Sequence, residues 1–201
     1  MRNMNNAVIL AALSMVLAAC NDWPPEPEPP YLTVLPGETV LRLVMVDNDG
    51  ALAHLKQVAQ NGSVISWMSS DHYTVSMDRG VVVATRGFGQ DLMGANANNT
   101  LQALAEGGSP EAVEGDIYYG MYRRQLSYLS ADNKPWSIQV GCRMSLGEFN
   151  DDLVRHVETC ASHSGIQFKN IYWLNDYGLI VKSLQWPSAV TGLMDISYTS
   201  Q

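Results

Sequence analysis

Segments of alternating apolar and polar residues, separated by turn-forming residues about every ten positions, run through most of this chain of 201 residues. The segment 39–46 (TVLRLVMV) is followed by the turn-forming run 47–50 (DNDG). Residues 51–60 suit a helix or a strand, but the strand-like residues 63–69 follow Asn61-Gly62, a strong hairpin signal. We therefore expect 51–60 and 63–69 to pair as antiparallel strands.

The same pattern predicts further strands along the chain. They are 73–77, 81–85, 116–129, 136–144, 153–160, 167–174, 179–185 and 193–198, with turns at 78–80, 131–134 and 175–178. In the segment 91–108, Asn98-Asn99-Thr100 is expected to cap a short helix at 101–106, which Gly107-Gly108 ends. We expect a single all-β domain over residues 31–201. It would be a curved antiparallel sheet (a meander, open half-barrel or sandwich-like) with one or two short helices.

The N-terminal residues 1–19 have the layout of a bacterial export signal. The apolar run after Arg2 is shorter than the roughly 20 residues that a transmembrane helix needs. Residues 17–20 (LAAC) match the lipobox of bacterial lipoproteins, which implies cleavage before Cys20 and lipidation of that cysteine. The alternative is ordinary secretion with Cys20 as an unmodified thiol. By resemblance to enterobacterial sorting rules, Asn21 favours the outer membrane, with the domain on its periplasmic side.

Proline is concentrated between the cysteine and the expected β domain. Residues 20–30 include the run WPPEPEPP at 23–30. Because proline fixes φ and removes a backbone donor, this run is neither helix nor sheet interior. We expect a polyproline II stalk of roughly 25 Å that holds the folded domain off a membrane.

The charge balance argues against one class of partner. The chain has 12 Lys and Arg against 20 Asp and Glu, a formal net charge of -8. Because this composition does not neutralise a run of phosphates, it argues against nucleic acid. An acidic domain also repels acidic polymers at low salt, so the composition favours a protein partner or a neutral glycan.

Cys142 and Cys160 remain after lipidation, in a chain that meets oxidising conditions. We favour a disulfide between them, which would stabilise the fold by roughly 3 kcal/mol. A zinc site is the competing interpretation, because His156 and His163 lie near Cys160, although the spacing His-x₃-Cys-x₂-His is not a familiar zinc pattern. Two unpaired buried thiols are the third possibility.

The segment 86–91 (RGFGQD) has two glycines but lacks the Gly-Lys-Ser/Thr ending of a phosphate-binding loop. We favour a structural role, in which Gly87 and Gly89 let the backbone leave a strand at positive φ and Arg86 pairs with Asp91. The alternative is that Arg86 and Asp91 line a ligand site.

Four tryptophans lie in the expected domain, and aromatic faces stack on sugar rings. They are Trp67, Trp136, Trp173 and Trp186. Core or rim packing is the more common role of strand tryptophans. Trp173 and Trp186, on opposing strands of one expected hairpin, are the pair best placed to form an aromatic platform. The candidate glycan or partner surface comprises Trp67, Arg86, Asp91, Trp173 and Trp186.

Two parts of the chain resemble the YjbF family of lipoproteins, which includes a lipoprotein of group 4 capsule operons. The first part comprises 67–71 (WMSSD) and 80–93 (GVVVATRGFGQDLM), and the second comprises 170–173 (NIYW) and 178–186 (GLIVKSLQW). The resemblance implies an outer-membrane lipoprotein of capsule or exopolysaccharide production, with a curved antiparallel sheet and no established catalytic activity.

We therefore expect a non-catalytic accessory factor without a cofactor or a metal. Its partners would be the membrane, through the lipid, and a polysaccharide or other proteins of exopolysaccharide export. The sequence has no HExxH pair and no G-x-S-x-G elbow. One alternative is a periplasmic carrier of lipid or lipid-linked sugar, which requires an open apolar cavity. The other is a glycan-modifying hydrolase, which requires two acids at one cleft.

Overall fold

The structure is a computed structural model that describes residues 39–47, 50–107, 121–129, 134–150 and 153–200. The expected export signal, Cys20, the stalk and residues 116–120 of one expected strand lie outside these ranges. In the described part of the chain, no helix is long and apolar enough to cross a bilayer.

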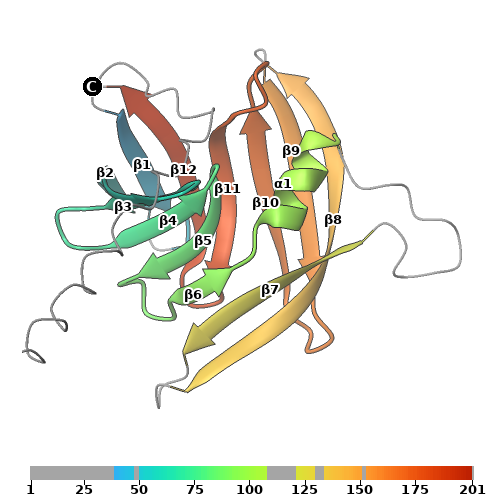
Figure 1. Cartoon of the computed structure of the whole chain (residues 1–201), viewed down its shortest axis with the longest axis horizontal. Helices are drawn as coiled ribbons and strands as arrows, with labels where there is room; N and C mark the ends of the chain where they lie inside the picture. The colour runs from blue at the N-terminus through green and yellow to red at the C-terminus, as the bar shows by residue number, and fades with distance from the viewer. Residues whose placement is uncertain (1–38, 48–49, 108–120, 130–133, 151–152, 201) are drawn as a thin grey trace, which may run out of the picture. The chain divides into compact units, whose positions relative to one another are not determined.

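Twelve strands form one antiparallel sheet, so the expected all-β curved sheet is confirmed (Figure 1). The strands are β1 (Thr39–Met45), β2 (Ala51–Asn61), β3 (Val64–Met68), β4 (Thr74–Asp78), β5 (Val81–Arg86), β6 (Leu92–Ala95), β7 (Tyr122–Leu129), β8 (Pro135–Asn150), β9 (Leu153–Ala161), β10 (Gln167–Leu174), β11 (Ile180–Ser188) and β12 (Gly192–Ser200). Their order is β5-β4-β3-β2-β1-β12-β11-β10-β9-β8-β7-β6. The edge strands β5 and β6 also contact each other, so the sheet curls until it nearly closes.

The sequence pattern missed one strand and misplaced the start of the helix. Strand β6 has four residues, which is too short to show an alternating pattern. The sequence pattern predicts only a helix in the segment 91–108 that contains it. Helix α1 (Asn98–Ala105) begins three residues before the expected start, so Asn98-Asn99-Thr100 form its first turn and do not cap it. The side chain of Asn96 accepts a hydrogen bond from the backbone N–H of Asn98 instead, at 2.9 Å.

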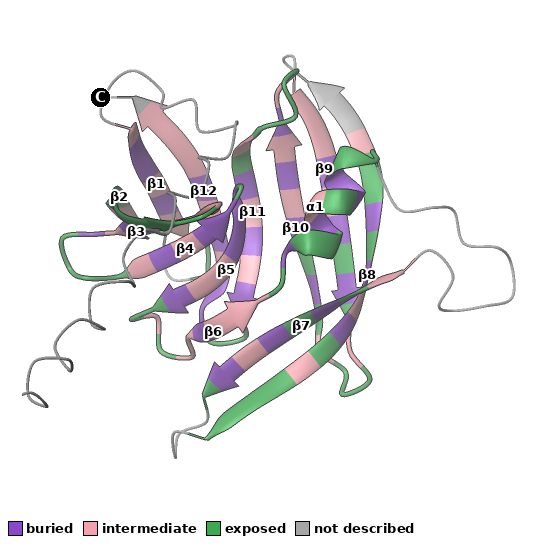
Figure 2. Ribbon diagram, in the orientation of Figure 1, coloured by how far each residue is buried: buried purple, intermediate pink, exposed green. Residues whose placement is uncertain are grey.

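The inner face of the curled sheet is filled by side chains from nearly every strand, and Figure 2 shows buried and more exposed residues alternating along them. The main cluster includes Leu41, Leu43, Leu55, Trp67, Val75, Met77, Leu126, Val140, Met194 and Ile196. A second cluster joins α1 to the sheet, through Ala103 and Leu104 of the helix with Met144 and Tyr172 of the strands. This alternation fixes which residues of each strand point inward and which point outward.

The hairpin at one edge of the sheet packs against β11. Arg79 and Gly80 form its two-residue turn with φ of 48° and 91°, as a type I′ turn requires. The buried side chain of Gln185 on β11 accepts a hydrogen bond from the N–H of Val82 and donates one to the carbonyl of Gly80, both at 2.8 Å. These bonds satisfy backbone groups at the end of an edge strand, whose outer side is not paired with a further strand of the sheet.

Cys142 and Cys160 are direct cross-strand partners on β8 and β9, and they form a disulfide. The expected disulfide is therefore confirmed. The zinc interpretation is wrong, because both sulfur atoms are bonded to each other, and so is the interpretation as unpaired thiols. His156 points inward and is buried, whereas His163 is exposed in the turn after β9.

Replacing both cysteines by alanine should lower the free energy of unfolding by about 3 kcal/mol, because the disulfide closes a loop with a sequence separation of 18 residues. Chemical denaturation of the oxidised protein and of the Cys142→Ala/Cys160→Ala variant measures this. Dithiothreitol should destabilise the parent protein and leave the double variant unchanged. Equal stability of the oxidised protein and the double variant would contradict the prediction.

Candidate functional site

The carboxylate of Glu158 on β9 lies at the centre of a buried polar cluster on the inner face. Glu158 is fully buried, and the Arg124 guanidinium on β7 lies 2.7 Å from its Oε2. The same carboxylate accepts hydrogen bonds from Thr100 and Tyr122 at 2.7 Å, from Asn170 at 2.6 Å and from Tyr172 at 3.1 Å. One side chain therefore links α1, β7, β9 and β10.

The surroundings of Glu158 keep it ionised. Burial by itself would raise the pKa of Glu158, but the Arg124 guanidinium and the hydrogen bonds outweigh burial and hold this pKa below its ordinary value. The pKa values of Tyr122 and Tyr172 are raised by burial and by the neighbouring carboxylate, so both hydroxyls stay protonated and donate. Glu158 is an ionised acceptor with no exposed surface, an arrangement that stabilises the fold and does not suit proton transfer to a substrate.

Sequence reasoning missed this cluster. Arg124, Glu158 and Asn170 are separated by more than ten residues in the sequence, and no spacing rule connects them. They meet because the register pairs Asn170 with Glu158 and sets Arg124 at an inward position two strands away. One signal in the sequence could have found it. Arg124 and Glu158 are charged residues at inward positions of their strands, and a buried charge requires a partner.

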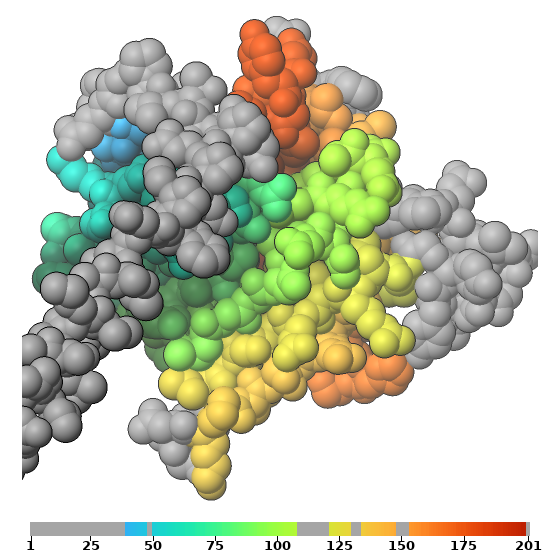
Figure 3. Space-filling model, viewed as in Figure 1, coloured from blue at the N-terminus to red at the C-terminus, as the bar shows by residue number. Residues whose placement is uncertain are grey.

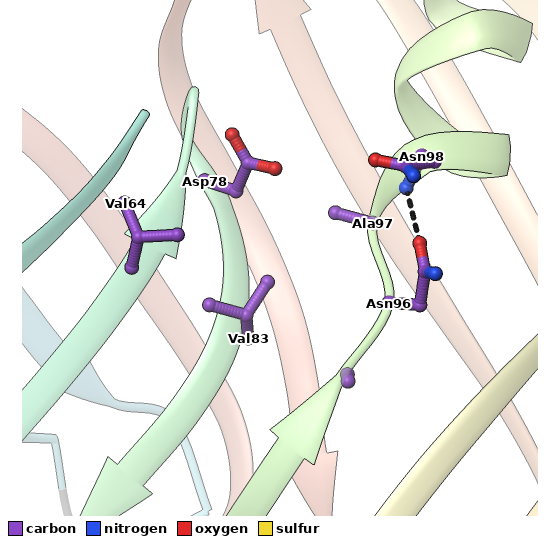
Figure 4. A pocket seen from close by; sticks show the side chains of 7 residues that line it. Val64, Asp78, Val83, Asn96, Ala97 and Asn98 are labelled. Atoms are coloured by element: carbon purple, nitrogen blue, oxygen red, sulfur yellow. Dashed lines mark hydrogen bonds between the residues drawn. The ribbon is translucent and has the colours of Figure 1, made fainter. Parts of the chain in front are cut away.

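A shallow depression of about 320 Å³ lies where β5 and β6 separate. Val64, Asp78 and Val83 line one side, and Ala95 to Asn98 line the other (Figure 4). In the space-filling view, β6 and α1 form the surface between β5 and β7 (Figure 3). Asp78 is the single carboxylate among the lining residues, and it pairs with Arg79 at 3.0 Å. The depression lacks the two acids that a glycoside hydrolase requires.

The segment 86–91 is a turn organised by Asp91. The Asp91 carboxylate accepts hydrogen bonds from the backbone N–H groups of Gly87 at 2.8 Å and Phe88 at 3.0 Å. The φ angles of Gly87 and Gly89 are 94° and 93°, as the sequence predicted. Arg86 donates to the carbonyls of Thr85 and Leu92, so it does not form the expected pair with Asp91. Both side chains hold the turn together.

The candidate tryptophans have different environments. Trp67 is 3% exposed and packs edge-on against Tyr198, so it offers no surface for a ligand. Trp186 stacks on Phe168 and packs against the main core cluster, because a bulge in β11 interrupts the register there.

Trp173 points to the outer face, where the Nζ of Lys182 lies 5.3 Å from its ring centroid. The expected platform of Trp173 and Trp186 is therefore not formed.

Trp136, at the start of β8, stacks on Tyr128 and is 36% exposed.

Comparison with known proteins gives one family. The family model described as "Group 4 capsule polysaccharide lipoprotein gfcB, YjbF" matches residues 22–198. Among solved structures, the hypothetical lipoprotein YmcC from Escherichia coli (K12) is similar, with a TM-score of 0.65 and 15% sequence identity. The similarity covers 82% of this chain and 87% of that chain, and it shows a shared fold. No curated protein matches this chain.

Replacing Glu158 by glutamine should lower the free energy of unfolding at pH 7 by about 3–5 kcal/mol, because the Arg124 charge would remain buried without its partner. Arg124→Gln should lower the free energy of unfolding by a similar amount. The double variant should lose less stability than the two single variants added together, because the two side chains are in contact. Chemical denaturation measures all three.

The folded-state pKa of Glu158 lies below its ordinary value of 4.5, so its contribution to stability is complete above that pH and is lost as the pH falls towards the folded-state pKa. Glu158→Gln should lack this part of the pH dependence. A glutamine variant as stable as the parent protein would show that the ion pair is unimportant.

Proposed function

Because the chain belongs to the YjbF family of group 4 capsule polysaccharide lipoproteins, we propose that it is a lipid-anchored accessory protein of capsule or exopolysaccharide production. The family match over residues 22–198 carries this proposal, since it spans nearly all of the chain beyond Cys20. In this proposal the lipid on Cys20 holds the chain at the periplasmic side of the outer membrane. The proline-rich stalk then sets the distance between the membrane and the sheet.

A binding role is supported by the chemistry of the described residues. The carboxylate of Glu158 is buried and bonded to Arg124 and to four further side chains, and the depression between β5 and β6 contains one carboxylate, which is paired with Arg79. A carrier of lipid would need an apolar cavity on the inner face. In the described part of the sheet, that face is filled by the two core clusters. These observations favour a protein that acts through its outer surface.

Replacing Cys20 by serine should release the protein from the membrane fraction and reduce the polysaccharide at the cell surface, because the lipid fixes where the protein acts. The measurement is fractionation, together with quantification of surface polymer, in a producing strain that carries only the variant.

Asn21→Asp provides the matched control, because it keeps the lipidated cysteine and changes the residue that favours the outer membrane. It should remain in the membrane fraction but leave the outer membrane, with reduced surface polymer. Normal polymer from the soluble Cys20→Ser protein would exclude a role for anchoring.

A further inference from the structure

The basic side chains of this acidic protein are concentrated on the outer face of one part of the sheet. Residues paired across neighbouring strands point to the same face, and the buried core marks the inner one. The following residues alternate with inward-pointing neighbours and therefore point outward: Arg42, Arg123, Arg143, Arg155, Lys169 and Lys182. They are half of the 12 Lys and Arg in the chain. We call this surface the cationic face.

Carboxylates are nearly absent from the same surface. Among the outward side chains that the structure describes on β1, β2 and β7 to β12, Asp195 is the single carboxylate, and it lies 3.5 Å from Lys182. Glu158, the other described acid of these strands, points inward. The chain has a formal net charge of -8, so this face has the opposite sign to the protein as a whole.

The centre of the cationic face is a row of side chains aligned by register across five neighbouring strands, and it follows the curl of the sheet. The register aligns Arg42, Ser197, Lys182, Trp173 and Arg155 on β1, β12, β11, β10 and β9. Strands lie about 4.8 Å apart, so the row is roughly 20 Å long.

Arg143 on β8 and Lys169 on β10 lie to one side of this row. The half-buried aliphatic side chains of Ile171 and Val157 lie between them and the row. The stems of long basic side chains cover such aliphatic surface while their charges stay in water.

This arrangement suits an extended anionic sugar polymer. Guanidinium and ammonium groups pair with carboxylates. The half-buried indole of Trp173 lies between Lys182 and Arg155, with the Nζ of Lys182 over one side of its ring, so a sugar ring would stack on its other side or its exposed edge. An open row of this length suits repeated units of one chain better than a single small anion. We infer that the row from Arg42 to Arg155 binds an acidic polysaccharide. This inference rests on the proposed function in polysaccharide production and names the chemistry of its ligand.

The test measures binding of the full chain, in nonionic detergent, to polygalacturonate as the acidic polymer and to dextran as the neutral one. The parent protein should bind polygalacturonate more tightly than dextran, and the affinity should fall as salt rises. The Arg42→Gln/Arg155→Gln/Lys182→Gln variant should lose about tenfold in affinity, since each exposed charge contributes modestly. Trp173→Ala should weaken binding without changing its salt dependence.

Lys182 and Arg79 provide a matched pair of single substitutions. Their side chains are 45% and 46% exposed, and each lies beside an aspartate, but Arg79 is in the β4–β5 turn, away from the row. Lys182→Gln should weaken binding of polygalacturonate, Lys182→Arg should retain it, and Arg79→Gln should leave it unchanged. If Lys182→Gln and Arg79→Gln weakened binding equally, binding would depend on the net charge of the protein and not on the row. That result would overturn the inference.

The remaining outcomes separate the inference from the proposed function. Absence of binding to polygalacturonate, or equal binding of dextran, would overturn the cationic row as an acidic-polymer site and leave the family role intact. Binding of the row to vesicles of phosphatidylglycerol and phosphatidylethanolamine, without binding to polygalacturonate, would overturn it in favour of a membrane surface. Normal polymer output from the Cys20→Ser protein would reject the proposed anchoring, whereas row-dependent binding of polygalacturonate would still support the inference.

Discussion

The antiparallel register of the twelve strands is the constraint on which the other features of this protein depend. Because side chains alternate along a strand, pairing fixes the face of every residue once the core is known. The register brings Cys142 opposite Cys160, sets Glu158 next to Asn170 and aligns Lys182 with Trp173. A shift of one residue in β9 would expose Glu158 and bury Arg155. The core, the disulfide and the cationic face therefore share a single cause.

The inner face contains a charged centre as well as an apolar core. Arg124 and Glu158 lose their hydration when they are buried, and the ion pair with its additional hydrogen bonds offsets that cost. Thr100 joins the same carboxylate, so the cluster also fixes α1 against the sheet. We interpret it as a determinant of how the helix and three strands are arranged. The interior therefore serves the fold, and the outer surface is the part of the protein that is open to a partner.

The outer surface changes what the composition suggested about partners. Averaged over the chain, a net charge of -8 argues against acidic polymers. The described strands show that charge is unevenly distributed, with the row around Lys182 and Trp173 positive and most acids elsewhere in the sequence. The proposed function and the inferred ligand are compatible because a polymer that lies along the sheet interacts with the positive charges of the row near it. The net charge of the whole chain has less effect at that distance, since salt screens distant charges.

The sequence by itself determined the all-β class, most strand positions, and the turns next to Gly62 and Gly80, because alternation and turn chemistry are local signals. It favoured the disulfide over two alternatives, and the register of β8 and β9 decided among them. The sequence also carried the family resemblance that the family model confirms. Only the tertiary structure decided that Trp67 is buried, that Trp186 stacks on Phe168, and that Glu158 meets Arg124. It also decided that Arg42 and Arg155 share one row. These facts depend on strand order, on a bulge and on the curl of the sheet, which arise from pairing between distant segments and leave no mark within any one segment.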